Sequence, residues 1–296
     1  MFIIVYYQAL GVKLNCLFVS DLHGDIKKYQ KLFEIVKKEE PDGVFFGGDL
    51  LPNQFSTDRS VQNFVKDVIF KKISNIKSNA KKDIRFFFIL GNDDPRAFEK
   101  YFIDADSKKI IDYVCEKTVN FGDLYVTGYP YVPPTPFQLK DWERYDVSRF
   151  VDVGVISPEE GLRTVDIALD EIKYNYISTD LKKLSKNAPV EKTIFLFHSP
   201  PYNSNLDRAA LDGKNVDHAP VDVHIGSIAI TQFIEKRQPF LTLHGHVHES
   251  YSLTKKWSEK KGKTYCYSAA NHDSDLVIIR FNTKDLEKSI RSVVKI

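Results

Sequence analysis

The chain alternates short apolar runs with amphipathic segments, and this alternation limits the folds that it can adopt. Apolar runs at residues 14–20, 43–48 and 84–90 are typical of buried strands, while residues 25–40 and 58–78 carry apolar side chains at helical spacing. Strands that alternate with helices through short connections form parallel sheets with right-handed crossovers. The sequence therefore predicts an α/β protein.

The second half of the chain contains more strand signals than helix signals. Apolar runs predict strands at residues 124–129, 192–197, 239–244, 263–268 and 275–281, and helical patterns lie near residues 165–186 and 225–237. The lysine-rich stretch at residues 255–263 is expected to form a solvated hairpin tip. No repeat or Gly/Ser linker separates the halves, so residues 1–296 are expected to form a single domain.

Two long irregular segments, at residues 129–160 and 199–224, interrupt the order of strands and helices. Loops of this length within a compact domain are usually functional or disordered, and the aromatic residues here argue against disorder. Tyr131, Trp142 and Tyr145 in the first segment either anchor it to the core or stack on a base or aryl group.

Charge and cysteine content exclude several classes of protein. The 42 Lys and Arg residues nearly balance 40 Asp and Glu residues, so nucleic acid is not an expected partner. The three cysteines, Cys16, Cys115 and Cys266, are far apart, which predicts neither a disulfide framework nor a thiolate zinc site and favours a cytoplasmic setting.

The apolar residues 1–11 lack the basic leader of a signal peptide, and no apolar stretch approaches the roughly 18 residues of a membrane span. We interpret residues 1–11 as an extra edge strand or as the result of a start codon assigned too far upstream.

Five predicted strands run directly into Asp, Asn or His residues. These residues are Asp21, His23, Asp49, Asn92, Asp93, His198, His246 and His248. Taken singly, each is more often a helix cap, a turn residue or a buried histidine. Sites in parallel α/β sheets form where strands end, so their joint placement predicts a functional site at one edge of the sheet.

The stretch 243–249, LHGHVHE, places three of the eight histidines of the chain at alternate positions. A strand would present these rings on one face. Buried neutral imidazoles each need a hydrogen-bond partner and repel one another once protonated, unless a cation gathers their lone pairs. The stretch therefore indicates a metal site.

The chain resembles the calcineurin-like metallophosphoesterase family over residues 14 to about 281. The resemblance rests on Asp21-x-His23, Gly48-Asp49, Gly91-Asn92, His198 and Gly245-His246-x-His248 in this order. It implies two mixed β-sheets packed face to face and flanked by helices, in a four-layer α/β/β/α sandwich. By position, one metal ion would be held by Asp21, His23, Asp49 and His248, and a second by Asp49, Asn92, His198 and His246. Asp49 would bridge the two ions.

Two residues that precede His246 receive structural interpretations. Gly245 is expected to give the backbone the freedom that brings His246 and His248 together. His244 lies outside the family motif, and we expect it to pack in the core or to hydrogen-bond near the ligands.

The implied chemistry is hydrolysis of a small phosphate ester, of phosphodiester or nucleotide type, by a metal-bridging hydroxide. Oxygen and imidazole donors without thiolates suit Mn²⁺, Fe, Zn²⁺ or Mg²⁺, and we favour Mn²⁺. Two such ions lower the pKa of a shared water and clamp the phosphate oxygens. Two alternatives are a binding scaffold that has lost its chemistry and, with less support from the charge balance, a nuclease.

The chain departs from the family where many members carry a histidine that protonates the leaving group. Here Asp93 occupies that position, and burial would have to raise its pKa for it to serve as an acid. His224 in the second irregular segment could replace it, as could His218 or His272. Substrates with good leaving groups would need no acid.

Arg208 is the candidate for binding the phosphate group of the substrate, because a guanidinium matches phosphate oxygens. The alternative is an ion pair with Asp207 or Asp212 on the surface of the same segment.

Overall fold

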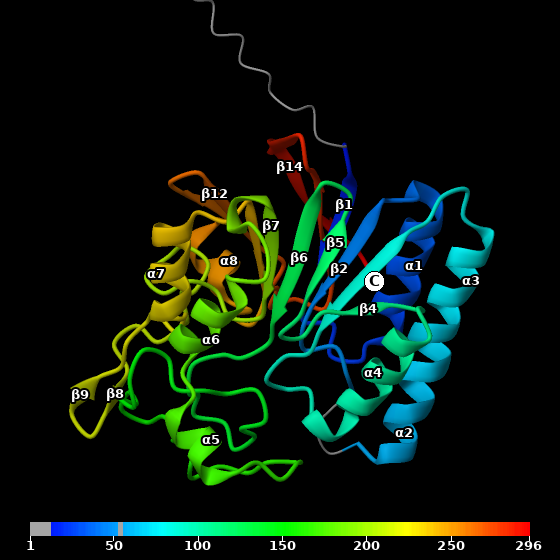
Figure 1. The fold of residues 1–296 in the computed structure, drawn as a ribbon. Helices are drawn as coiled ribbons and strands as arrows, with labels where there is room; N and C mark the ends of the chain where they lie inside the picture. Colours follow the sequence, from blue (N-terminus) through cyan, green and yellow to red (C-terminus); the bar gives the residue numbers. More distant parts are fainter. Residues whose placement is uncertain (1–12, 53–55) are drawn as a thin grey trace, which may run out of the picture.

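The computed structural model describes residues 13–52 and 56–296, and two six-stranded sheets lie at its centre (Figure 1). The first sheet has the order β14-β13-β1-β2-β3-β4. Its strands are β1 (Asn15–Val19), β2 (Gly43–Gly47), β3 (Arg85–Ile89), β4 (Asp112–Tyr113), β13 (Leu276–Asn282) and β14 (Asp285–Val294). The strands β1 to β4 are parallel, whereas β13 and β14 are antiparallel to their neighbours.

The second sheet has the order β11-β12-β10-β7-β6-β5. Its strands are β5 (Thr118–Phe121), β6 (Leu124–Tyr129), β7 (Thr193–Phe197), β10 (Leu241–His244), β11 (Ser258–Lys261) and β12 (Thr264–Ser268). The four central strands are parallel, and the two edge strands are antiparallel to their neighbours. Two mixed sheets with helices outside them confirm the predicted fold class.

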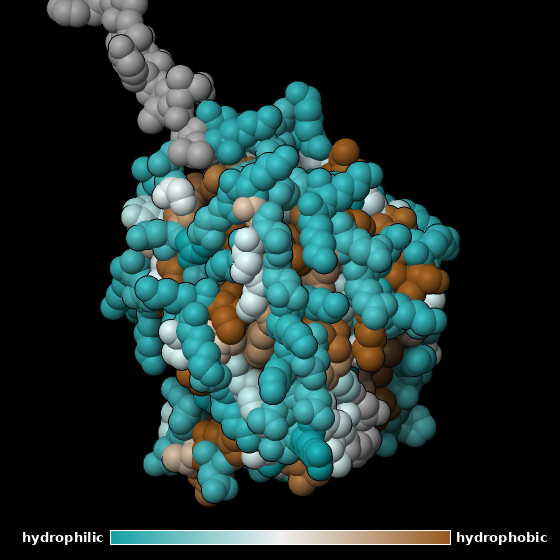
Figure 2. Space-filling view, turned by 90° about the vertical axis from the view of Figure 1, so that its right-hand side faces the viewer, coloured by the Kyte–Doolittle hydropathy of each residue, from teal (hydrophilic) through white to brown (hydrophobic). Residues whose placement is uncertain are grey.

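Helices cover the outer faces of both sheets (Figure 1). The first sheet is covered by α1 (Ile26–Glu39), α2 (Asp58–Asn63), a π-helical stretch (Phe64–Phe70), α3 (Lys71–Asn79), a 3-10 turn (Arg96–Phe98) and α4 (Glu99–Ser107). The others are α5 (Leu169–Tyr174), α6 (Ile177–Leu184), a 3-10 turn (Val190–Lys192), α7 (Ile228–Arg237) and α8 (Ser250–Thr254). The surface over the first helical layer is largely hydrophilic (Figure 2). In the described parts of the chain, no helix has the length and apolar character required to cross a membrane.

The strand β3, RFFFI, shows why the central strands are continuously apolar. Phe86 and Phe88 point into the core under the helices, whereas Phe87 points into the core between the sheets. The second core also receives Ile194 and Leu243 from the other sheet. Strands covered on both faces lose the alternation of apolar and polar residues that marks a half-exposed strand.

The two irregular segments lie beyond the ends of the strands, with α5 and the short hairpin of β8 (Asn215–Val216) and β9 (Ala219–Pro220) below the sheets in Figure 1. Tyr131, Trp142 and Tyr145 are at most 2% exposed, which favours the interpretation that they anchor the first segment to the core. The indole Nε1 of Trp142 donates to the backbone oxygen of Asp94 at 2.8 Å, so this anchor reaches the loop that follows β3.

Two sequence-based expectations differ from the structure, and one strand was not predicted. The stretch 255–263 is only partly a hairpin tip, because Ser258–Lys261 forms the edge strand β11. The helix expected near 165–186 is two short helices, α5 and α6, separated by Asn175 and Tyr176. The strand β14 carries too many polar residues to give an apolar signal. The edge strand expected at residues 1–11 lies outside the described residues.

Candidate metal centre

All seven predicted metal ligands follow parallel strands of the two sheets. Asp21 and His23 follow β1, Asp49 follows β2, Asn92 follows β3, His198 follows β7, and His246 and His248 follow β10. The loops after β1 and β10 are joined directly, because the backbone N–H of His246 donates to Asp21 Oδ1 at 3.0 Å. Strand ends of both sheets therefore meet at one place, which brings residues from positions 21 and 246 together.

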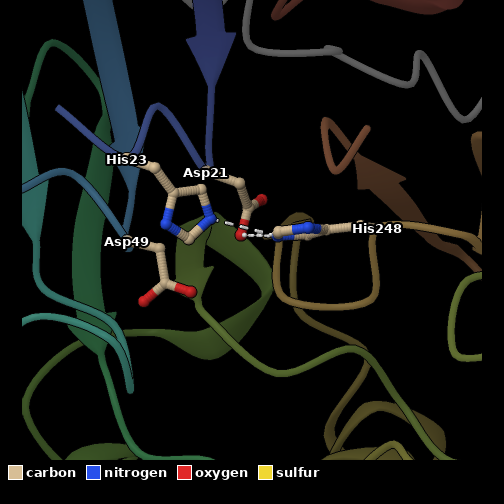
Figure 3. A group of neighbouring side chains, drawn as sticks. All are labelled: Asp21, His23, Asp49 and His248. Carbon is tan, nitrogen blue, oxygen red and sulfur yellow. Dashed lines mark hydrogen bonds and ion pairs between the residues drawn. The ribbon is translucent and has the colours of Figure 1, made fainter. Parts of the chain in front are cut away.

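The first group of possible ligands consists of Asp21, His23, Asp49 and His248. Figure 3 shows the side chains of Asp21, His23 and His248 meeting, with Asp49 beside His23. One possible ligand atom from each lies within 4.8 Å of the others. The Nε2 atoms of His23 and His248 are 3.3 Å apart, and His248 Nε2 is 3.3 Å from Asp21 Oδ1. Two imidazole nitrogens facing each other beside carboxylates are the arrangement that a shared cation would satisfy.

The second group consists of Asp49, His198 and His246, whose possible ligand atoms also lie within 4.8 Å of one another. His198 Nε2 is 3.2 Å from Asp49 Oδ2 and 3.0 Å from Asn92 Oδ1, which brings the predicted amide ligand to the same point. Asp49 belongs to both groups and so lies between them.

Hydrogen bonds outside the two groups fix the orientation of the ligands. His198 is fully buried and its Nδ1–H donates to the backbone oxygen of Gly47 at 2.7 Å, so Nε2 faces Asp49. The backbone N–H of Asp93 donates to Asp49 Oδ1 at 2.8 Å. These bonds hold the ring of His198 and the carboxylate of Asp49 next to each other.

The pKa shifts show how the group balances its charge. Burial alone would lower the pKa of His198, but the carboxylates of Asp49 and Asp21 outweigh burial and raise this pKa to about 10. The pKa of His248 likewise rises to about 9, because its bond to Asp21 outweighs burial. Burial would raise the pKa of Asp49, yet His198 holds it below its ordinary value. Protons on histidines thus balance buried carboxylates, and divalent cations could replace those protons, so the donor set fits two such ions.

Close backbone approach shapes the loops around the site. Asp21, His23, Asp49 and His246 adopt positive φ angles of 56°, 44°, 52° and 74°, a costly conformation that proteins concentrate at functional sites. Gly245 has no positive φ, which corrects the expectation that it supplies backbone freedom. Gly245 instead lets the loop pack closely against Ser20 and Asp21, because an added Cβ would lie 2.0 Å from Ser20 Oγ and 2.8 Å from Asp21 Oδ2.

Asp94 organises the site, a role that its sequence context did not predict. Its buried carboxylate accepts backbone N–H groups from Leu50, Leu51 and Gly91 at 2.7–2.9 Å, which ties the loop after β2 to the loop after β3. Burial and the nearby Asp49 carboxylate raise the pKa of Asp94 to about 7. Its only sequence signal is the second Asp of Gly-Asn-Asp-Asp, which is equally typical of a turn.

Asp93 stands at the edge of the first group, with its side chain 49% exposed and its Oδ2 3.7 Å from His23 Nδ1. Burial and the Asp49 carboxylate raise the pKa of Asp93. Arg208 forms an ion pair with Asp212 at 2.5 Å, which is the alternative to phosphate binding that the sequence left open. His224 lies outside both groups, where its Nδ1 is 2.7 Å from Asp207 Oδ1, and His218 and His272 are exposed.

His244 packs in the core, as its position outside the motif predicted. It is fully buried, its Nδ1–H donates to the backbone oxygen of Ser199 at 2.8 Å, and its Nε2 accepts from Thr242 Oγ1 at 2.8 Å. Its ring stacks on Phe197 with centroids 5.6 Å apart. Burial lowers the pKa of His244 to about 3.

Replacing His244 by Phe is expected to lower the free energy of unfolding by an amount that shrinks in acid. The unfolded chain takes up a proton on His244 below about pH 6.5, whereas the folded chain does so only near pH 3, so this histidine stabilises the fold less as pH falls between these values. Urea denaturation of both proteins at pH 7, 6 and 5 measures the difference. The difference in the free energy of unfolding between the two proteins should shrink by up to about 1.4 kcal/mol per pH unit below pH 6.5. A constant difference would contradict the assignment.

The chain is similar in sequence to one protein family. A family model described as calcineurin-like phosphoesterase matches residues 14–250. The chain belongs to this family. The calcineurin-like phosphoesterases use divalent metals, and the two groups of side chains described above are the candidate ligands in this member.

Solved structures agree with the family fold. One crystal structure matches with a TM-score of 0.64 at 17% identity, covering 96% of this chain and 100% of its own. The crystal structure of TT1561 of Thermus thermophilus matches with a TM-score of 0.59 at 15% identity, covering 96% of this chain and 100% of its own. At these identities the likeness concerns the fold. The comparison with curated proteins found no match.

Proposed function

We propose that this phosphoesterase hydrolyses a small phosphodiester or nucleotide-type ester with two divalent cations. Asp21, His23, Asp49 and His248 would hold one ion, and Asp49, Asn92, His198 and His246 the other. The observation that carries the proposal is the membership of Asp49 in both groups of possible ligands, because a shared carboxylate sets two ions close together.

The bound ions would supply an activated water and neutralise charge on the phosphate. The protein contributes the orientation of the groups around them. The Asp93 N–H holds Asp49, the Gly47 carbonyl holds His198, and Asp94 fixes the two loops that carry Asp49 and Asn92. Held in this way, the donors need little rearrangement as charge develops on the phosphate oxygens.

A preference for diesters is supported by the carboxyl group of Asp93. It lies half-exposed beside the first group, where a substrate phosphate would approach. When ionised, it repels a dianionic monoester more strongly than a monoanionic diester. Three free, buried cysteines support a reducing, cytoplasmic setting.

The assay compares bis-p-nitrophenyl phosphate with p-nitrophenyl phosphate. With added Mn²⁺ we expect faster hydrolysis of the diester, a fall to the uncatalysed rate after EDTA treatment and dialysis, and recovery when Mn²⁺ is returned. Fe²⁺, Zn²⁺ and Mg²⁺ are tested in parallel because the ligand set does not select among them. The proposal is overturned if neither ester is hydrolysed with any of the four ions.

A further inference from the structure

Asp207 and His224 form a hydrogen-bonded pair within the second irregular segment. Asp207 is fully buried, and its carboxylate accepts backbone N–H groups from Asn203 and Ser204 at 2.9 Å and from Gly226 at 3.2 Å. His224 Nδ1 lies 2.7 Å from Asp207 Oδ1. A carboxylate held by several backbone donors fixes the position and tautomer of the imidazole that it contacts.

The outer nitrogen of His224 is free to act on another molecule. Its Nε2 has no hydrogen-bond partner among the residues that the structure describes, and the side chain is 24% exposed. The hydroxyl of the neighbouring Tyr202 does not bond to this nitrogen, because it donates to Asp222 Oδ2 at 2.7 Å. An imidazole bonded to a carboxylate on one side and open on the other has the arrangement of a proton-transfer group.

The segment that carries His224 contacts two stretches that leave the metal site. The backbone of His224 pairs with that of Arg208, and the N–H of Ala210 donates to Glu249 Oε1 at 3.3 Å, one residue after His248. The ring of His224 also lies edge-on to Tyr202, four residues after His198, with centroids 6.0 Å apart. The segment that carries His224 is thus in contact with the continuations of two proposed ligand loops.

We infer that His224, positioned by Asp207, gives the leaving group its proton during ester hydrolysis, and this inference rests on the proposed function. One water loses a proton to solvent, and the resulting hydroxide bonds to phosphorus. The bond from phosphorus to the leaving oxygen breaks, and the proton on His224 Nε2 passes to that oxygen. His224 remains as a neutral imidazole with Nδ1–H bonded to Asp207, and it regains a proton from solvent. This role would fill the place of the family histidine that the chain lacks at position 93.

The test is the dependence of the rate on the leaving group. His224→Gln should lower kcat/KM on the order of 10²-fold for diphenyl phosphate, whose phenolate is a poor leaving group, because general acid catalysis contributes about this much. The same variant should retain nearly the wild-type rate on bis-p-nitrophenyl phosphate, whose leaving group needs no proton. His224→Asn serves as a second variant should the first fail to fold, and exposed His218→Gln in the same segment is the matched control.

Asp207→Asn tests the positioning role, and it should reproduce the selective loss on diphenyl phosphate to a smaller extent. Equal losses on both substrates, or no loss on either, with the His224 variants would overturn the role of His224 while leaving the proposed function intact. A wild-type protein that hydrolyses neither bis-p-nitrophenyl phosphate nor p-nitrophenyl phosphate with any of the four ions would overturn the proposed function and, with it, this inference.

Discussion

Replacing Asp49 by Asn is expected to lower kcat/KM for bis-p-nitrophenyl phosphate on the order of 10³-fold, as when a main electrostatic stabiliser of a transition state is lost. Asp49 is the shared member of both ligand groups and lies 3.2 Å from His198 Nε2. An amide cannot bridge two cations as a carboxylate does, so at least one ion should be lost. Steady-state kinetics in excess Mn²⁺, with metal content from plasma mass spectrometry, measures both effects.

The matched control is Asp83→Asn, which changes an aspartate that is 72% exposed and only loosely paired with Lys77 at 4.0 Å. It should keep the wild-type rate and metal content. An Asp49→Asn protein that binds two ions per chain and hydrolyses the diester normally would show that Asp49 is not the bridging ligand.

Replacing Asp94 by Ala is expected to give the largest loss of stability, on the order of 3–5 kcal/mol in the free energy of unfolding. The change leaves the backbone N–H groups of Leu50, Leu51 and Gly91 buried without their acceptor. The two loops that these bonds join carry Asp49 and Asn92, so metal affinity should fall as well. Urea denaturation and Mn²⁺ titration calorimetry measure the two quantities.

Asp94→Asn keeps one oxygen acceptor and should be less destabilising than the alanine variant. A stability loss below about 1 kcal/mol for Asp94→Ala, with Mn²⁺ affinity unchanged, would mean that the carboxylate does not organise these loops.

The central strands could be predicted because they are buried on both faces and are therefore apolar throughout. In β3, for example, Phe86 and Phe88 pack in one core and Phe87 packs in the other. The strands β11 and β14 gave no such signal, since edge strands carry Lys, Glu and Ser without loss of pairing. The π-helical stretch Phe64–Phe70 within the predicted helix at 58–78 was likewise not predicted, because a periodicity of 3.6 residues does not distinguish it from an α-helix.

The gathering of the candidate ligands at one site could be predicted because each follows a strand, and strand ends are a local property of the sequence. Their assignment as ligands of two metal ions came from the resemblance to the family. Partnerships between distant residues could not be predicted. Asp94 accepts hydrogen bonds from Leu50 and Leu51, which are 44 and 43 positions away in the sequence. Whether Arg208 binds a substrate phosphate or pairs with Asp212 depends on how its segment folds. His224 was one of several candidate histidines, and only the tertiary fold distinguishes it by its bond to Asp207.

The most direct test of the account is the anomalous scattering of Mn²⁺ in crystals of the metal-loaded protein. Two peaks are expected, roughly 3.5–4 Å apart, one contacting Asp21, His23 and His248 and the other contacting Asn92, His198 and His246, with Asp49 between them. A single peak, or peaks away from Asp49, would contradict a two-metal centre built from these seven side chains.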